Sequence, residues 1–267
     1  MATKLGIIGG GVMGEALLSR LLFKGTYAPT DVFVSDPSAD RRETLASQYQ
    51  VHVSEQNQSV VDAADVLLLA IKPQLFDVVI QALVRQNPQQ LVLSILAGVP
   101  LARLESAFPN YPVIRAMPNT PATVGAGMTA IAGGTHTQPT HLDLAMQVFG
   151  AVGEVVEVPE RLMDAVTGLS GSGPAYVALM VEALADGGVA AGLPRAIAQQ
   201  LALQTVLGTA ELLKASNLHP AELKDRVTSP GGTTIAGVSH LERQGFRSAL
   251  IEAVRAAAMR SQELGRS

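Results

Sequence analysis

Apolar residues in the first half of the chain occur in short runs that predict strands, with helical patterns between several of them. The run Asp65–Ala70 is almost continuously apolar, as expected for a central parallel strand that is buried on both faces. Other strands are expected at Lys4–Ile8, Asp31–Ser35, Val51–Val53, Leu91–Ile95, Val113–Ala116, Met128–Ala132 and Val155–Val158. Strands that alternate with helices predict βαβ units and a parallel sheet.

The pattern changes near Pro159, and beyond Arg161 it predicts helices only. The expected helices are Ala175–Ala191, Pro194–Ser216, Pro220–Val227, Thr233–Arg243 and Phe246–Leu264. Proline stands near several of their starts and glycine follows some of their ends, as is common for helices. We therefore expect an α/β fold, in which a doubly wound parallel-sheet domain over residues 1–159 is followed by an all-helical C-terminal domain over residues 160–267.

The first two of these helices are apolar on every side. Between Ala175 and Ala210 the only charged residues are Glu182, Asp186 and Arg195. A helix without a polar face has to be buried. The two alternatives are an internal core of the helical domain and an intertwined homodimer, in which small residues would let helices approach closely.

Composition narrows the classes of function. Of the 267 residues, 48% are hydrophobic and only 16% are charged, which argues against disorder. The formal net charge of −4 offers no basic surface for a nucleic acid or an anionic membrane. Cysteine is absent and the histidines show no metal-ligand spacing, so neither a disulfide nor a metal site is expected. We recognise no targeting or membrane-spanning segment and expect a cytoplasmic protein.

The glycines near the N-terminus carry the first chemical signal. Gly9, Gly11 and Gly14 match G-x-G-x-x-G, directly after a predicted strand and at the start of a predicted helix. In that context the glycines allow a tight turn, a close approach of backbone to a pyrophosphate, and close packing of helix on strand. This predicts a dinucleotide-binding domain of Rossmann type, with the phosphates at the start of the helix.

The residues after the second strand bear on which dinucleotide binds. Asp36 stands where a carboxylate would accept the ribose 2′-hydroxyl of NAD and repel the 2′-phosphate of NADP. Ser35, Arg41 and Arg42 favour NADP, because arginine can hold that phosphate. The choice between the two cofactors stays open.

Several further loops offer polar groups or free backbone amides. The end of the central strand should line the cofactor, because open α/β sheets bind ligands at the carboxyl ends of their strands. Its residues are Ala70, Ile71, Lys72 and Pro73. Asn119, in the proline-bounded loop Met117–Pro121, fits the nicotinamide end. The segments Gly168–Tyr176 and Ser229–Thr234 each precede a helix, and amides at two helix starts favour a small carboxylate substrate.

The motifs at residues 9–14, 70–73, 115–121, 168–176 and 229–234 together resemble the Δ1-pyrroline-5-carboxylate reductase family, over nearly the whole chain. The resemblance implies NAD(P)H-dependent reduction of the C=N bond of 1-pyrroline-5-carboxylate to L-proline, the last step of proline biosynthesis. It implies NADPH as the cofactor, whereas Asp36 could favour NADH. It also implies a dimer of interlocked helical domains, often assembled into decamers.

Matched position by position, the resemblance implies roles for individual residues. The implied cofactor contacts are Gly9, Gly11, Val12, Met13, Ser35, Asn57, Lys72 and Ala97. The implied substrate loop is Gly231, Gly232, Thr233 and Thr234, whose amides would hold the carboxylate. Thr234 is the expected catalytic residue, with its hydroxyl bonded to the ring nitrogen, and Glu160 is expected near the substrate amine.

One position distinguishes this chain from the related β-hydroxyacid dehydrogenases. Those enzymes carry a lysine four residues after the last glycine of G-x-x-G-x-G, and here that residue is Val177. The missing proton donor favours an imine over a carbonyl substrate. Two alternatives stay open: a reductase of another imine or carbonyl compound, and a protein that senses dinucleotides without turnover.

Overall fold

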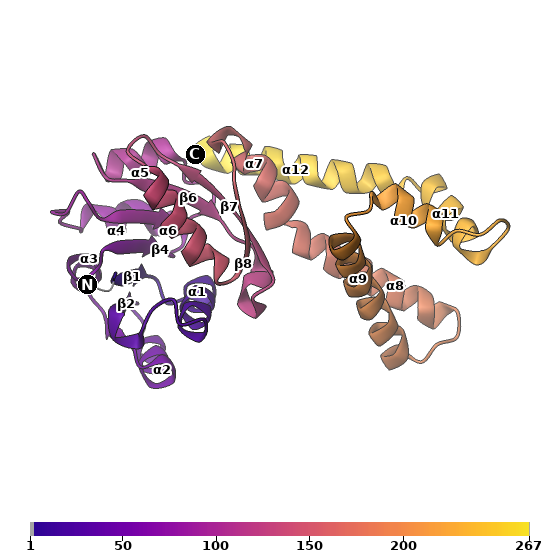
Figure 1. Cartoon of the computed structure of the whole chain (residues 1–267), viewed down its shortest axis with the longest axis horizontal. Coiled ribbons are helices and arrows are strands. Elements are labelled where there is room, and N and C mark those ends of the chain that lie inside the picture. The colour runs from indigo at the N-terminus through magenta and orange to yellow at the C-terminus, as the bar shows by residue number, and fades with distance from the viewer. Residues whose placement is uncertain (1–2, 267) are drawn as a thin grey trace. The chain divides into compact units, whose positions relative to one another are not determined.

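The computed structural model describes residues 3–266, which form two compact units. The first unit combines residues 3–172 with residues 256–266, and the second contains residues 173–255. Figure 1 shows a sheet with helices in the first unit and helices alone in the second. The predicted fold class, an α/β domain followed by a helical one, is confirmed.

The first unit is built on an eight-stranded sheet with the order β3-β2-β1-β4-β5-β6-β7-β8, within the described residues. The strands are β1 Leu5–Ile8, β2 Val32–Ser35, β3 His52–Ser54, β4 Val66–Leu69, β5 Leu91–Ser94, β6 Val113–Met117, β7 Gly127–Gly133 and β8 Gly153–Glu157. All eight predicted strands are confirmed to within two residues at each end. The strand order reverses between β1 and β4, and a doubly wound sheet binds its ligand at that point.

The last two strands, β7 and β8, contradict the expectation of a wholly parallel sheet, because they run parallel to each other and opposite to the first six. β7 runs antiparallel to β6, with Met117 opposite Ala130. Only a short 3-10 turn, Thr120–Val124, lies between these two strands. A parallel return needs a crossover of a dozen or more residues, so this short connection allows only an antiparallel strand.

Helices cover both faces of the sheet in the first unit. They are α1 Val12–Phe23, α2 Ala39–Tyr49, α3 Asn57–Ala63, α4 Phe76–Gln81, α5 Leu101–Ala107, α6 Pro139–Gly150 and α7 Met163–Val166. The second unit contains α8 Gly173–Ala190, α9 Arg195–Ser216, α10 Pro220–Arg226, α11 Thr233–Arg243 and the first part of α12 Phe246–Arg266.

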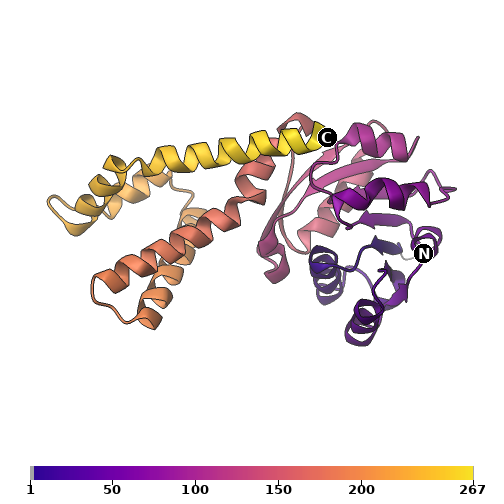
Figure 2. The ribbon, with the colours of Figure 1, turned by 180° about the vertical axis from the view of Figure 1, so that it is seen from behind.

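The helices α8 and α9 form an antiparallel hairpin, visible in Figures 1 and 2. They approach closely because Gly188 faces Ala198: a Cβ on this glycine would lie 3.1 Å from the alanine Cβ. Most of their apolar surface remains uncovered, since Leu179 is 66% exposed and Leu203 is 60% exposed. An internal core within the described chain therefore does not bury these helices, and that alternative is wrong.

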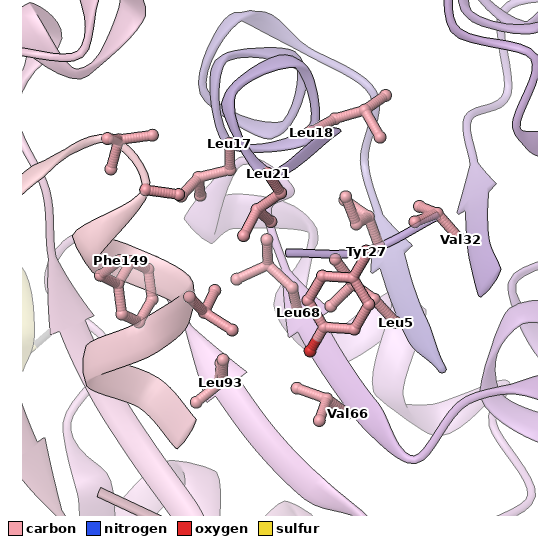
Figure 3. Close-up of a cluster of buried hydrophobic side chains, with 14 of the residues drawn as sticks. Leu5, Leu17, Leu18, Leu21, Tyr27, Val32, Val66, Leu68, Leu93 and Phe149 are labelled. Atoms are coloured by element: carbon pink, nitrogen blue, oxygen red, sulfur yellow. The ribbon is translucent and has the colours of Figure 1, made fainter. Parts of the chain in front are cut away.

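The core of the first unit lies on both faces of the sheet. Figure 3 shows the first cluster, in which Leu17 and Leu21 of α1 and Phe149 of α6 pack against Leu68 of β4. The neighbouring residues Leu67 and Leu69 point to the opposite cluster, under α3, α4 and α5. Side chains of a strand alternate between faces, so a strand buried on both faces has to be apolar at every position.

Packing divides the chain differently from the predicted boundary after Pro159. Met163 of α7 is fully buried in the second core cluster. The hydroxyl of Ser261 on α12 donates to Asp164 at 2.6 Å. These contacts place residues 160–172 and 256–266 in the sheet unit. Within residues 3–266 no helix is long and apolar enough to cross a membrane.

Candidate active site

The predicted glycine turn joins β1, β4 and α1 at the point where the strand order reverses. Gly9 has a φ of +104°, and its amide donates to the Ser35 carbonyl at 2.8 Å. A Cβ on Gly9 would lie 2.6 Å from the carbonyl oxygen of Ala70, and a Cβ on Gly14 would lie 2.2 Å from that of Gly9. Both glycines are therefore required by the fold itself.

Gly11 has no such structural requirement. Its φ of −68° suits any residue, and a Cβ at this position would meet nothing within 4 Å. It caps α1 without a side-chain hydrogen bond, and Val12 beside it is 75% exposed. A glycine that neither packing nor backbone conformation requires, at an uncapped helix start, fits a ligand phosphate that lies against the backbone.

The structure brings Ser35, Asp36 and Asn57 together at the end of β2. The buried Ser35 hydroxyl donates to Oδ1 of Asn57 at 2.8 Å. The Asp36 carboxylate accepts from the Gly10 amide at 3.0 Å and from the Ser38 amide at 2.9 Å. Asp36 therefore lies beside the glycine turn, as the sequence predicts.

The two arginines that favoured NADP bond to the protein itself. Arg41 donates to the Gly10 carbonyl and pairs with Glu15, which also accepts from the Tyr49 hydroxyl at 2.9 Å. Burial of Glu15 opposes its ionisation, but the hydrogen bonds from Arg41 and Tyr49 outweigh burial and lower the pKa of Glu15.

Arg42 is also engaged by backbone. Its Nη1 donates to the carbonyls of Asp36, at 2.8 Å, and of Pro37, at 2.9 Å. Both guanidinium groups thus hold the turn around Asp36.

The ends of β4 and β5 line a cavity of about 530 Å³. Of the predicted cofactor residues, Pro73 and Ala97 line it, whereas Ala70 and Ile71 lie half-buried beside the glycine turn and Lys72 is exposed. The other lining residues are Gln74, Gly98, Val99, Arg103, Thr167, Ser172, Ala257, Arg260, Ser261 and Leu264. Sequence analysis missed the contribution of α12, because no local pattern shows which residues a distant helix brings to a loop.

Asn119 connects two of the predicted motifs. Its side-chain amide donates to the Ser170 carbonyl at 3.1 Å and accepts from the Met128 amide at 2.9 Å. Asn119 thus holds the loop after β6 in place.

The segment Gly168–Tyr176, where an anion site is expected, spans a π-helical turn and the start of α8. Thr167–Gly171 is a π-helical turn that continues α7, and the Ser172 amide donates back to the Thr167 carbonyl at 2.8 Å. The anion site at this segment remains a prediction. Gly171 permits close packing, since a Cβ there would lie 2.9 Å from the Met117 side chain.

Glu160 forms an ion pair that the sequence analysis did not predict. Its carboxylate lies 3.1 Å from the guanidinium of the buried Arg115 and accepts the Leu101 amide at 2.5 Å. A carboxylate at the start of α5 complements the helix dipole. A charge inside the apolar strand 113–117 was the available signal for this pair. The expected role of Glu160 near the substrate remains a prediction.

The predicted substrate loop lies in the second unit, at the start of α11. Gly231 has a φ of +66°, and the Gly232 amide donates to the Ser229 carbonyl at 3.0 Å, closing a tight turn. Gly232 caps α11 without a side-chain hydrogen bond. The amides of Thr233 and Thr234 precede the first helical bond, which Ala236 makes to Gly232, and are available to a carboxylate. That this loop meets the cofactor remains a prediction.

Two of the histidines serve local structure by capping helices. His141 completes a capping box with Gln138 at the start of α6. His219 caps α10 by accepting the Ala221 amide at 3.2 Å. No group of three or more potential metal ligands occurs among residues 3–266.

Comparison with known proteins identifies the family. The family model for pyrroline-5-carboxylate reductase dimerisation matches residues 160–264, and the model for coenzyme F420-dependent NADP oxidoreductases matches residues 4–98. Pyrroline-5-carboxylate reductase of Synechocystis sp. is 64% identical over 266 residues, which cover 100% of both chains.

Solved structures agree with these matches. The pyrroline-5-carboxylate reductase of Coxiella burnetii has a TM-score of 0.93 and 33% identity, covering 100% of both chains. The pyrroline carboxylate reductase of Plasmodium falciparum, solved with NADP bound, has a TM-score of 0.86 and 30% identity, covering 98% of both chains. With full-length similarity in sequence and fold, and with the glycine turn and the Ser229–Thr234 loop in place, this chain belongs to the pyrroline-5-carboxylate reductase family.

Proposed function

We propose that this chain reduces the C=N bond of 1-pyrroline-5-carboxylate to give L-proline, the last step of proline biosynthesis. The observation that carries the proposal is the Ser229–Thr234 loop, whose uncapped amides at the start of α11 suit a small carboxylate. Family membership supplies the reaction class. A protein that only senses dinucleotides would have no use for such a loop.

In this proposal the glycine turn and its neighbours hold the dinucleotide. The amides at Gly11, Val12 and Met13 face the pyrophosphate in the open space in front of α1. Asp36 accepts the adenosine ribose hydroxyls, and the hydrogen-bonded pair Ser35 and Asn57 contacts the cofactor beside it. The strand ends add Lys72, Ala97 and Asn119 toward the nicotinamide end.

When bound, the reduced nicotinamide supplies a hydride to the carbon of the C=N bond. The free amides of Thr233 and Thr234, presented by the turn at Gly231 and Gly232, hold the substrate carboxylate, which fixes the ring in position. Thr234 bonds the ring nitrogen. A cyclic imine is basic enough to arrive protonated, so the chain needs to orient it but needs no strong acid. Val177, at the lysine position of the β-hydroxyacid dehydrogenases, fits that requirement.

We further propose that NADH is preferred over NADPH. Asp36 places a carboxylate beside the glycine turn, where a 2′-phosphate would be repelled. Arg41 is held by Glu15 and Arg42 by backbone carbonyls, so neither is directed to a phosphate.

The proposed assembly is a homodimer through the helical unit. The exposed apolar faces of α8 and α9 support it, because apolar patches of this extent mark interfaces. The match to a dimerisation model over residues 160–264 also supports homo-oligomerisation. A decamer of such dimers and a cytoplasmic location complete the proposal.

A spectrophotometric assay tests the reaction directly. Purified protein is mixed with 1-pyrroline-5-carboxylate and either NADH or NADPH, and the loss of absorbance of the reduced cofactor is followed. We expect formation of L-proline with both cofactors and a higher kcat/KM with NADH. Turnover of other cyclic imines but not of this one would contradict the substrate, and tight cofactor binding without any turnover would contradict catalysis.

A further inference from the structure

The end of the last helix contacts two loops that flank the proposed nicotinamide end. Residues 256–266 of α12 belong to the sheet unit. Figures 1 and 2 show this end of the helix beside α7. None of its residues was predicted to take part in the site.

The first contact is a hydrogen bond to α7. Ser261 is only 5% exposed, and its hydroxyl donates to Oδ1 of Asp164 at 2.6 Å, across 97 positions of sequence. Asp164 follows the fully buried Met163, so the bond attaches α12 to an element anchored in the core. The chain continues from α7 into the π-helical turn, whose Ser170 carbonyl accepts from Asn119.

The second contact is between two glycines. A Cβ on Gly265 would lie 3.3 Å from the carbonyl oxygen of Gly98. Gly98 has a φ of +76° and directly follows Ala97, the proposed cofactor contact at the end of β5. The close approach of α12 therefore fixes the loop that carries Ala97.

The cavity of about 530 Å³ connects the two contacts. Pro73 and Ala97 form one part of its wall, and Thr167 and Ser172 of the π-helical segment form another. The third part comes from α12, through Ala257, Arg260, Ser261 and Leu264. The helix end thus closes a space that opens on proposed cofactor residues.

We propose that the end of α12 positions the nicotinamide half of the cofactor, with Ser261 as a positioning residue. Ser261 acts through Asp164 and the π-helical turn on one side, and the helix acts through Gly98 on Ala97 on the other. The inference rests on the proposed function, because Ala97 and Asn119 are cofactor contacts only within it.

The test measures binding of NADH and of ADP-ribose, which lacks the nicotinamide, to the whole protein by calorimetry. The Ser261→Ala variant should bind NADH about three- to tenfold more weakly and ADP-ribose as the wild type does, as expected for loss of one hydrogen bond. The KM for NADH should rise by the same factor while kcat changes little. Ser261→Thr keeps the hydroxyl and should restore NADH binding.

A second variant tests the positioning role of α12 independently of whether Ser261→Ala folds well. Gly265→Ala favours the helix, because alanine is the better helix former, but presses a methyl group toward the Gly98 carbonyl. It should also weaken NADH binding and spare ADP-ribose. Gly150→Ala, at the end of α6 where a Cβ meets nothing within 4 Å, is the matched control and should bind both ligands normally.

Three results separate failure of this inference from failure of the proposed function. Wild-type NADH affinity in both α12 variants, or an equal loss for NADH and ADP-ribose, would overturn the positioning role. Gly11→Val, which blocks the proposed pyrophosphate space, should abolish binding of both ligands. If Gly11→Val leaves both affinities intact, the proposed cofactor site itself is wrong.

Discussion

Thr234 carries the sharpest expectation at the scale of a single residue. It lies in the first turn of α11, directly after the glycine turn that leaves the helix amides uncapped. Thr234→Val keeps the shape and removes the hydroxyl, and so removes a hydrogen bond to a charged ring nitrogen worth about 1.5–3 kcal/mol. We expect kcat/KM for pyrroline-5-carboxylate to fall about tenfold to hundredfold in steady-state assays.

The matched control is Thr228→Val. Thr228 lies just after α10, and its hydroxyl donates to the Lys224 carbonyl at 2.6 Å. It should keep near wild-type kcat/KM. Equal losses in both variants would assign the effect at Thr234 to folding.

Asp36 decides the proposed cofactor preference. Asp36→Ser removes the negative charge beside the glycine turn, so the ratio of kcat/KM for NADPH to that for NADH should rise by about tenfold or more. Asp40→Ser, an exposed carboxylate in the first turn of α2, is the control and should leave the ratio unchanged. An unchanged ratio in Asp36→Ser would show that this carboxylate does not face the ribose.

Glu15 makes the stability of the glycine turn depend on pH. Its hydrogen bonds from Arg41 and Tyr49 lower its pKa in the folded state below the ordinary value of 4.5. A depressed carboxyl pKa adds stability above 4.5 that is lost as the pH falls through the folded-state value. Glu15→Gln should therefore lower the Tm at pH 7, and the difference from the wild type should shrink in acid. A difference in Tm between Glu15→Gln and the wild type that stays constant from pH 7 to pH 3 would contradict this.

At the scale of elements, the glycine turn contains glycines of two kinds: some are required by the fold, and Gly11 is required only by the proposed ligand. A Cβ on Gly14 would lie 2.2 Å from the Gly9 carbonyl, so Gly14→Ala should destabilise the fold by about 1–3 kcal/mol in denaturant unfolding. A Cβ at Gly11 would meet nothing within 4 Å, so we expect Gly11→Val to leave unfolding unchanged and to abolish NADH binding. The reverse pattern would mean that the open space at Gly11 is not a ligand site.

The helices and strands also show how much of the fold the local sequence pattern predicts. α11 begins and ends at the predicted residues, and the apolar runs locate the strands, most clearly the central strands, where burial on both faces leaves a continuous signal. The π-helical turn at Thr167–Gly171 leaves no comparable signal, whereas the antiparallel direction of β7 is readable from its short connection to β6. A single π-turn is too short to show a periodicity of its own, and a connection of fewer than a dozen residues rules out a parallel return.

At the scale of the whole molecule, exposed apolar surface predicts self-association. Leu203→Glu on α9 places a charge on the face that the single chain leaves 60% exposed. A buried unpaired charge opposes association, so light scattering should show a lower mass than the wild type, toward the 27.8 kDa of one chain. Val78→Glu, at an apolar residue of α4 that is 69% exposed, is the control and should keep the wild-type mass. Wild-type mass in Leu203→Glu would exclude α9 from the interface.

The sequence by itself determined the α/β plan, the glycine turn, the carboxylate beside it at Asp36 and the place of the Ser229–Thr234 turn before α11. Each of these depends on residues close together in the chain, where backbone conformation and side-chain periodicity act directly. Only the tertiary structure decided that Arg41 pairs with Glu15, that Arg115 pairs with Glu160, and that Ser261 reaches Asp164. Those pairings join residues far apart in the chain, and their partners follow from how helices pack on the sheet, which no local pattern encodes.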